Sequence, residues 1–359
     1  QDALRHMPQI IDIKAAGTAM RFMTSFLATV SGEHVITGTE RMRNRPIAVL
    51  VDALRSLGAD ICYEEKDGFP PLRIRGRELA GGRISLPGNV SSQYISSLLM
   101  VAPTLRQGLV LELTGEVISR PYIDMTLAIM RQFGAKAQWN GEREIRVEAV
   151  PYSPIPYYIE SDWSAASYWY EMVALSGDDE AEVMLPGLFR DSLQGDSAVA
   201  ELFSRLGVET KHDGNSVCLA KKACDSEAFV CNMVNQPDLA QTVAVTCCML
   251  GKHFRISGLQ TLRIKETDRI AALQKELGKL GYLIGVEGDD TLFWNGETGT
   301  DMTGTEDIAI DTYEDHRMAM AFAPVALKRD SITINNPEVV SKSYPSFWED
   351  MKKAGFKLA

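Results

Sequence analysis

The sequence has few cysteines, and the six that it contains show neither a metal-binding nor a disulfide pattern. No two of them form a Cys-x-x-Cys pair, and no histidine stands at the spacing of a zinc ligand. We therefore expect buried free thiols in a reducing cytoplasm, with no metal ion and no disulfide framework. The six are Cys62, Cys218, Cys224, Cys231, Cys247 and Cys248.

Long apolar runs and an excess of positive charge are also lacking. No apolar run is long enough to span a membrane. The formal net charge of -11 argues against a nucleic-acid partner, which requires a basic face, although a small basic cleft remains compatible with it. The 45% hydrophobic and 24% charged composition is typical of a globular protein, and 359 residues favour two domains.

A unit of about 74 residues recurs five times, and internal repeats of this kind decide the architecture of a chain. Each copy contains an amphipathic helix that ends in an apolar residue and glycine, followed by a short strand and a tight turn. The glycines are Gly58, Gly134, Gly207, Gly281 and Gly355. The turns are predicted at Asp67-Gly68, Asn140-Gly141, Asp213-Gly214 and Gly288-Asp289.

The helix of the first copy shows how such a unit forms. Pro46 is predicted at the first helical position, where its missing N–H costs nothing. One apolar stripe at helical spacing then follows, formed by Ile47, Leu50, Val51 and Leu54. Gly58 supplies the left-handed residue that ends the helix.

A second helix in each copy is apolar nearly all round and is therefore expected to be buried. Its first turn is the exception, because it carries small or polar residues. Helix N-termini present free N–H groups and the positive end of the helix dipole. Five such ends in one chain indicate a highly anionic ligand. The residues are Gly17, Thr18, Ser91, Ser92, Gln93, Ser164, Asp238, His316 and Arg317.

A Pro-rich stretch, residues 151–156, predicts a stiff connection, because prolines with extended neighbours do not form a helix. We therefore expect a first domain of residues 1–157 and a second of residues 158–359. If the repeats form two sets of three, a sixth copy is needed, and most of it would precede Gln1. The first domain is accordingly expected to lack its N-terminal part.

Two charged segments indicate chemistry. On one helix, Lys265 and Arg269 would lie four residues apart on the same face, where like charges repel. With Glu266 beside them, they indicate an anion site that has a proton-transfer group. The second segment leads into an apolar helix, and there Asp315 is expected to be the N-cap. A capping role leaves His316 and Arg317 unexplained.

Several segments in order, from about residue 10 to the C-terminus, together resemble the 5-enolpyruvylshikimate-3-phosphate synthase family. They read AGTAMR, GNVSSQ, SRPYIDMT, RIKETDR, YEDHRMAMAF and VSKSYPSFW. The resemblance implies a two-domain, inside-out α/β barrel of the enolpyruvyl transferase type, with three βαβαββ repeats in each domain. It also implies a monomer without a metal or organic cofactor.

The resemblance implies that the enolpyruvyl group of phosphoenolpyruvate is transferred to the 5-hydroxyl of shikimate 3-phosphate, with release of phosphate, in the shikimate pathway of aromatic amino acid biosynthesis. This reaction needs a base for the hydroxyl and an acid/base for the enol carbon. Asp238 and Glu266 match the family's residues for these two roles.

The resemblance also assigns the substrate-binding residues. Those for phosphoenolpyruvate are Gly17, Arg45, Gln93, Arg269, Arg317 and Lys342, with the two arginines Arg269 and Arg317 on the carboxylate. Those for shikimate 3-phosphate are Ser91, Ser92, Gln93, Ser119, Tyr122, Asp238, Thr261 and Lys265. Asp315 and His316 lie within a matching motif and are expected to tune the site.

Some positions depart from the family pattern. Ala15 stands where many members have Asn, Phe22 where many have Pro, and Thr261 where Asn is frequent. A Lys-Ser pair and an Arg that the family carries in an N-terminal segment are not in this sequence. Gly17 matches glyphosate-sensitive members, since naturally tolerant members have Ala there.

Two alternative functions compete with that of this family. UDP-N-acetylglucosamine enolpyruvyl transferase shares the fold, but its loop carries a reactive Cys shortly before an Arg-Pro. Residues 37–44, which precede Arg45-Pro46, contain no Cys. An inactive repeat scaffold that binds partners would have no need to collect Asp238, Arg269 and Arg317 at the ends of its elements.

Overall fold

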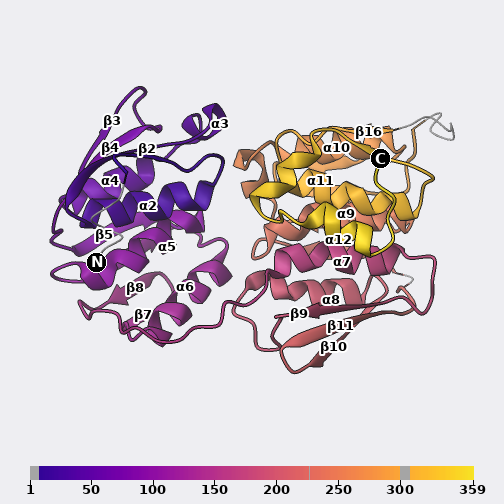
Figure 1. Cartoon of the computed structure of the whole chain (residues 1–359), viewed down its shortest axis with the longest axis horizontal. Helices are drawn as coiled ribbons and strands as arrows, with labels where there is room; N and C mark the ends of the chain where they lie inside the picture. The colour runs from indigo at the N-terminus through magenta and orange to yellow at the C-terminus, as the bar shows by residue number, and fades with distance from the viewer. Residues whose placement is uncertain (1–7, 226, 300–307) are drawn as a thin grey trace. The chain divides into compact units, whose positions relative to one another are not determined.

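The computed structural model describes residues 8–225, 227–299 and 308–359. The chain divides into two compact units, Gln1–Tyr157 and Tyr158–Ala359 (Figure 1), which are described one at a time. Residues 151–162, around the point of division, form neither helix nor strand. None of the described helices is of a length and apolarity that would let it traverse a lipid bilayer.

The first unit contains two copies of one topology, strand–helix–strand–helix–strand–strand. The first copy consists of β1 (Ile10–Asp12), α2 (Gly17–Thr29), β2 (Gly32–Thr37), α4 (Ala48–Ser56), β3 (Asp60–Tyr63) and β4 (Leu72–Gly76), with the short α3 (Glu40–Arg43) before α4. Its sheet has the order β1-β2-β4-β3. β1 is parallel to β2, and β4 is antiparallel to both of its neighbours.

The second copy repeats this pattern. It consists of β5 (Gly82–Pro87), α5 (Ser92–Val101), β6 (Leu109–Thr114), α6 (Arg120–Gln132), β7 (Ala137–Trp139) and β8 (Glu144–Val147). The sheet order is β5-β6-β8-β7, again with one parallel and two antiparallel pairings. The predicted βαβαββ repeat is therefore observed twice in this unit.

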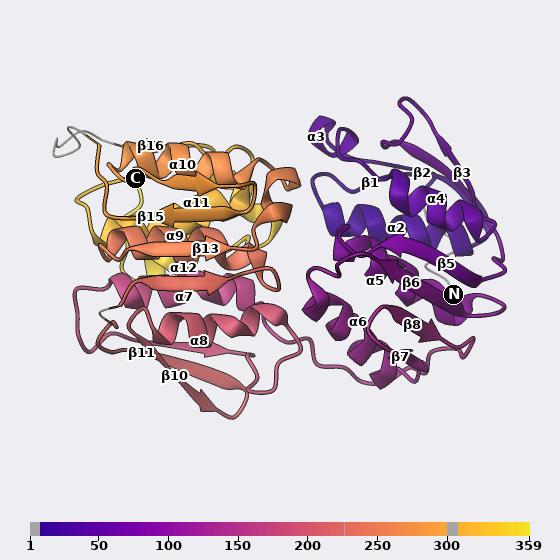
Figure 2. The same cartoon turned by 180° about the vertical axis from the view of Figure 1, so that it is seen from behind.

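The second unit has one copy with the same four-stranded sheet. This copy consists of β12 (Phe229–Asn232), α9 (Ala240–Met249), β13 (Phe254–Ser257), α10 (Arg269–Lys279), β14 (Gly285–Glu287) and β15 (Thr291–Trp294). The sheet order is β12-β13-β15-β14. Figure 2 shows β13 and β15 beside α9 and α10.

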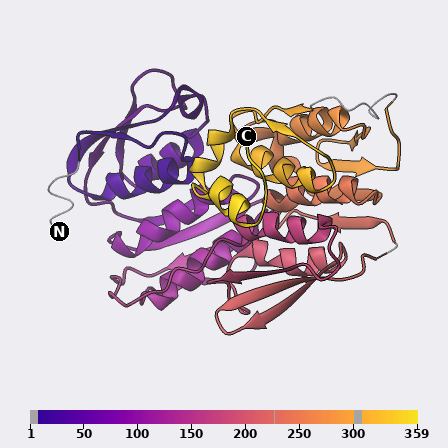
Figure 3. The ribbon, with the colours of Figure 1, turned by 45° about the vertical axis from the view of Figure 1, so that its right-hand side comes forward.

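Two partial copies flank it. The preceding copy has α7 (Trp163–Leu175), β9 (Glu182–Pro186), α8 (Val199–Ser204), β10 (Val208–Asp213) and β11 (Ser216–Lys221), and its antiparallel sheet has the order β10-β11-β9 (Figure 3). The last copy has β16 (Ala309–Ile310), α11 (His316–Phe322), β17 (Thr333–Ile334) and α12 (Phe347–Lys353), with β16 parallel to β17.

The helices that were expected to be buried form the centre of each unit. α2 packs against α5 in the first unit, and α9 packs against both α7 and α11 in the second. Each unit has its own hydrophobic core. Small polar side chains join neighbouring helices: Ser96 and Thr126 bring their hydroxyl oxygens within 2.8 Å between α5 and α6.

The five glycines of the repeat all have the predicted left-handed conformation, with φ between +87° and +100°. In four copies the N–H of the residue after the glycine donates to a carbonyl in the last helical turn, as in a Schellman motif. These four bonds run from Ala59 to Leu54, Ala135 to Met130, Tyr282 to Leu277 and Phe356 to Met351. The prediction of where these helices end is confirmed.

The predicted position of Pro46 is wrong. α4 begins at Ala48 with Ile47 as its N-cap, so Pro46 lies before the helix. Its carbonyl oxygen there accepts hydrogen bonds from Tyr94 Oη at 2.6 Å and Arg21 Nη2 at 3.3 Å. Contacts with α5 and α2, rather than the local helix preference of proline, set where α4 begins.

The expectation of buried thiols is correct for only part of the set. All six cysteines are free, but Cys62 and Cys224 are exposed. Cys62 lies on β3 directly after the buried Ile61, and alternation along the strand turns its side chain outward.

Candidate active site

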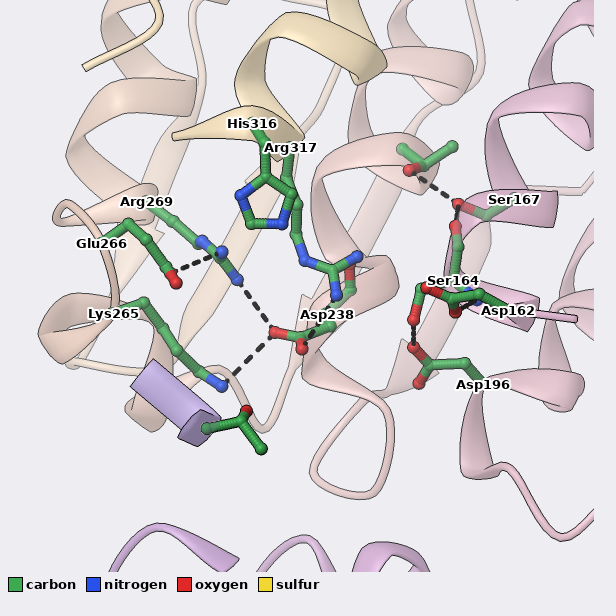
Figure 4. Close-up of polar contacts among 12 residues, drawn as sticks. Asp162, Ser164, Ser167, Asp196, Asp238, Lys265, Glu266, Arg269, His316 and Arg317 are labelled. Atoms are coloured by element: carbon green, nitrogen blue, oxygen red, sulfur yellow. Dashed lines mark hydrogen bonds and ion pairs between the residues drawn. The ribbon is translucent and has the colours of Figure 1, made fainter. Parts of the chain in front are cut away.

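Arg269 is the centre of a charged cluster in the second unit (Figure 4). Asp268 is the N-cap of α10 and accepts from the Ala271 N–H, so Arg269 is the first helical residue. Its side chain is 2% exposed. Nη1 donates to Asp238 Oδ1 at 2.9 Å, Nη2 to Glu266 Oε2 at 2.8 Å and Nε to Asp315 Oδ2 at 2.7 Å. One guanidinium thus fixes three carboxylates.

Asp238 accepts from cations of three different segments. It lies in the 3-10 turn Pro237–Leu239 that leads into α9. Arg317 Nη2 is 3.1 Å from Oδ2, and Lys265 Nζ is 3.4 Å from the same oxygen, Oδ1, that Arg269 contacts. Burial disfavours the charged carboxylate, but Arg317, Lys265 and Arg269 together outweigh it and hold the pKa of Asp238 well below its usual range.

Glu266 is shared by two cations. Besides Arg269, it accepts from Nζ of Lys342, the last residue of the 3-10 helix Pro337–Lys342. Burial lowers the pKa of Lys342, and the neighbouring Glu266 only partly offsets this effect. The Lys342 ammonium therefore loses its proton at a lower pH than an ordinary lysine.

Asp315 has the predicted capping role and a second role as well. As N-cap of α11 it accepts from the Arg317 N–H at 2.9 Å, while it also pairs with Arg269. His316 is buried beside it. Burial, together with the charges of Arg317 and Lys342, lowers the pKa of His316 to about 3, so the imidazole is neutral near pH 7.

Lys265 and Arg269 do not lie on one helix, which corrects the sequence prediction. The 3-10 helix Gln260–Ile264 ends before Lys265, and α10 begins only at Arg269. Capping by Asp268 sets the start of α10 and leaves Lys265 in non-helical backbone, with ψ of -148°. The two cations nevertheless meet at Asp238, because the turn between them brings both side chains to its carboxylate.

The cluster contains four cations and three carboxylates, so cations exceed carboxylates by one when His316 is neutral. Asp162 and Asp196 also act on Arg317, but four fixed cations gathered in one half-buried cluster still favour an anionic ligand. Among the described residues, no group of three or more His, Cys, Asp or Glu side chains is arranged to hold a metal ion.

A second group of predicted residues lies at the N-termini of α2 and α5 in the first unit. Gly17 is the first residue of α2, and a Cβ atom there would lie 2.6 Å from Arg45 Nη1. Gln93 Nε2 donates to Thr18 Oγ1 at 2.9 Å, which joins the two helix N-termini. In the structure Gly17 thus lies against Arg45, and Gln93 binds Thr18, the residue that follows Gly17.

The predicted serines stand at the starts of α5 and α6. Ser91 is the N-cap of α5 and accepts from the Gln93 N–H at 3.4 Å, and Ser92 is the first helical residue. Ser119 precedes α6 in a left-handed conformation, with φ of 53°, and its carbonyl accepts from the Tyr122 N–H at 3.2 Å. Two neighbouring helix N-termini with hydroxyl groups suit a phosphate.

Sequence reasoning did not assign a role to Arg21, which organises this group. The residue is 4% exposed, and Nη1 donates to the Gly17 carbonyl at 3.1 Å while Nη2 reaches the Pro46 carbonyl. Its Nε is buried without a hydrogen-bond partner among the described residues. The spacing offered a signal, because Arg21 lies one helical turn after Gly17.

Thr261 lies on the 3-10 helix Gln260–Ile264 of the second unit. It is half-buried, and its hydroxyl oxygen has no hydrogen-bond partner in the part of the chain that the structure describes.

Comparison with known proteins decides the family. The model of the family "EPSP synthase (3-phosphoshikimate 1-carboxyvinyltransferase)" matches residues 2–351. The chain belongs to this family. It is 55% identical over 356 residues to a 3-phosphoshikimate 1-carboxyvinyltransferase of Bacteroides fragilis, covering 99% of this chain and 86% of that protein. A relative of the same name from Photobacterium damsela is 38% identical over 340 residues, covering 94% and 77%.

Solved structures of the family share the fold. An EPSP synthase from Acinetobacter baumannii superimposes with a TM-score of 0.72 at 22% identity, covering 97% of this chain and 80% of that one. The expected fold class, the α/β fold of the EPSP synthase family, is confirmed by this likeness.

Proposed function

We propose that the protein transfers the enolpyruvyl group of phosphoenolpyruvate to the 5-hydroxyl of shikimate 3-phosphate and releases phosphate, as a 3-phosphoshikimate 1-carboxyvinyltransferase of aromatic amino acid biosynthesis. The observation that supports this most strongly is the 55% identity to a relative of that name over 99% of the chain. The cationic cluster around Asp238 and Glu266 supplies groups that such a reaction requires.

The reaction needs one base and one acid/base, and two carboxylates of the cluster are assigned to them. Asp238 takes the proton of the attacking hydroxyl, and Glu266 gives a proton to the methylene carbon of phosphoenolpyruvate. The hydroxyl oxygen then bonds to the enol carbon and gives a tetrahedral intermediate. Loss of a proton from the new methyl group, together with cleavage of the C–O bond to phosphate, restores the double bond.

Arg317 is the main residue that binds the phosphoenolpyruvate carboxylate. Arg269 donates four hydrogen bonds to Asp238, Glu266 and Asp315, so most of its N–H groups are already used within the protein. Within the described residues Arg317 donates two hydrogen bonds, one to the Asp238 backbone carbonyl and one to its carboxylate, so its planar fork retains donors for a ligand. Lys342 is assigned to the phosphate of phosphoenolpyruvate.

Most of the remaining substrate-binding residues that we propose lie at or near helix N-termini. Gly17, Arg45 and Gln93 are assigned to the phosphate of phosphoenolpyruvate. The residues assigned to shikimate 3-phosphate are Ser91, Ser92, Gln93, Ser119, Tyr122, Asp238, Thr261 and Lys265. A cytoplasmic monomer without a metal or organic cofactor is proposed with them.

The test measures phosphate release from phosphoenolpyruvate by the full chain with either shikimate 3-phosphate or UDP-N-acetylglucosamine as acceptor. Release that depends on shikimate 3-phosphate is expected, with none above background for the other acceptor. Glu266→Gln should abolish release while phosphoenolpyruvate still binds by calorimetry. Release only with UDP-N-acetylglucosamine, or with neither acceptor, would overturn the proposal.

A further inference from the structure

The turn that leads into α11 has an unusual backbone. The Asp315 N–H donates to the Thr312 carbonyl at 2.8 Å, which closes a β-turn. Its two central residues, Tyr313 and Glu314, both have positive φ, 53° and 56°. Turns with two central residues in this region normally use Asn, Asp or Gly, because a bulky side chain is strained there. Something outside the turn must therefore hold it in place.

The first restraint comes from Glu276, a fully buried carboxylate on α10. Tyr313 Oη donates to its Oε1 at 2.5 Å, and the Asp311 N–H donates to its Oε2 at 3.0 Å. Lys279 Nζ lies 2.6 Å from the same Oε2 and neutralises the charge. One side chain thus binds both a residue within the turn and the backbone just before it.

The second restraint is Arg269, at the start of the same helix. Its Nε donates to Asp315, the last residue of the turn. Arg269 and Glu276 are seven residues apart, which is close to two helical turns, so they lie on one face about 10 Å apart along α10. The segment from Asp311 to Asp315 is therefore fastened at both ends to a single helix.

We propose that Tyr313 and Glu276 are positioning residues, which hold the turn so that α11 presents Arg317 to the substrate. This inference rests on the proposed function, in which Arg317 binds the phosphoenolpyruvate carboxylate. Asp315 caps α11 through the Arg317 N–H, so the turn fixes the first helical turn and the origin of the Arg317 side chain. Relaxation of the turn toward negative φ would shift that origin and weaken the grip on the carboxylate.

Tyr313→Phe tests the hydrogen bond to Glu276 and keeps the ring. The matched control is Tyr170→Phe, which also removes one part-buried tyrosine hydrogen bond in the second unit, that to Thr210 Oγ1. We expect both variants to lose stability in urea, but only Tyr313→Phe to raise the KM for phosphoenolpyruvate, by roughly tenfold. The KM for shikimate 3-phosphate should change by less than about twofold.

A second pair of variants tests the backbone without touching the hydrogen bond. Glu314 is exposed, so Glu314→Gly should tolerate the positive φ and keep the wild-type KM for phosphoenolpyruvate. Glu314→Val should oppose that φ and raise this KM as Tyr313→Phe does.

The outcomes separate the inference from the proposed function. If the wild-type protein releases no phosphate with shikimate 3-phosphate, the proposed function fails. If the wild type is active and Tyr313→Phe matches Tyr170→Phe in both KM values, the positioning role is wrong. Glu314→Val with a wild-type KM for phosphoenolpyruvate would overturn it as well.

Discussion

Nη1 of Arg269 lies 2.9 Å from Oδ1 of Asp238, and this contact joins the first residue of α10 to the turn that opens α9. Through its other nitrogens the same side chain holds Glu266 and Asp315. One guanidinium therefore fixes the position of Asp238, the proposed base, relative to Glu266, the proposed proton donor. Its shape, and not only its charge, determines the geometry of the cluster.

Replacing Arg269 by Lys should destabilise the protein by roughly 3–5 kcal/mol, because a single ammonium cannot pair with one buried and two half-buried carboxylates. Urea denaturation measures the loss. Arg263→Lys is the matched control, since Arg263 pairs with Asp268 at a half-exposed site and should change stability by less than about 1 kcal/mol. Equal losses in the two variants would contradict the central role of Arg269.

Asp238→Asn should lower turnover by roughly 10²–10⁴-fold, the usual contribution of a general base. Binding of phosphoenolpyruvate should not weaken, because the variant removes a carboxylate that competes for Arg317. Steady-state kinetics and calorimetry give the two quantities. In the control Asp268→Asn, the asparagine still caps α10, so activity should remain close to that of the wild type. Normal turnover of Asp238→Asn would show that Asp238 is not the base.

Gly17→Ala should move Arg45, because the new Cβ would lie 2.6 Å from Arg45 Nη1. Glyphosate is longer than phosphoenolpyruvate and is expected to fill the same pocket, so the crowding should affect it more. We expect its inhibition constant to rise roughly 10- to 200-fold and the KM for phosphoenolpyruvate to rise less. Gly177→Ala is the control, since a Cβ there meets nothing within 4 Å. Equal changes for both ligands would refute the steric explanation.

As the pH increases, the KM for phosphoenolpyruvate should begin to rise at a lower pH than the ordinary pKa of a lysine would predict. The pKa of Lys342 is lowered by burial, so its ammonium is lost below the usual lysine range, and the neutral amine holds phosphate poorly. A KM measured from pH 7 to 10 tests this. In Lys342→Arg the cation persists, so the alkaline rise should disappear. The same rise in both proteins would assign it to another group.

Titration of His316 should cause no change in enzyme activity near pH 6.5, because burial and the neighbouring cations lower the pKa of its imidazole to about 3. Nuclear magnetic resonance of the imidazole follows this directly. The His316 resonance should stay that of a neutral ring from pH 5 to 8. A titration midpoint near 6.5 would show that the ring is more accessible to solvent and less affected by Arg317 than the structure indicates.

The repeat architecture could be predicted from sequence because its signals are local. A glycine that ends a helix needs only its own φ, and all five glycines adopted the predicted conformation. Pro46 was misplaced because its position depends on Arg21 and Tyr94, contacts that are distant in sequence.

The site was predictable in its residue types but not in its pairings. Like charges at Lys265 and Arg269 indicated an anion site even though the assumed helix was wrong. Which carboxylate meets which cation depends on tertiary structure, since Asp238 is 31 residues from Arg269 and 79 from Arg317. The contact between Glu276 and Tyr313, 37 residues apart, had no local signal either.

The ion pairs of the cluster affect when the proposed base, Asp238, becomes a strong base. Arg317 and Lys342 are paired with Asp238 and Glu266, the same carboxylates that are proposed to move protons. A substrate that brings its own carboxylate and phosphate competes with these side chains for the cations. As the cations turn toward the substrate, Asp238 loses partners that hold its pKa low, and nearby negative charge raises the affinity of its carboxylate for protons. Substrate binding thus makes Asp238 a stronger base at the moment when a hydroxyl is present to be deprotonated.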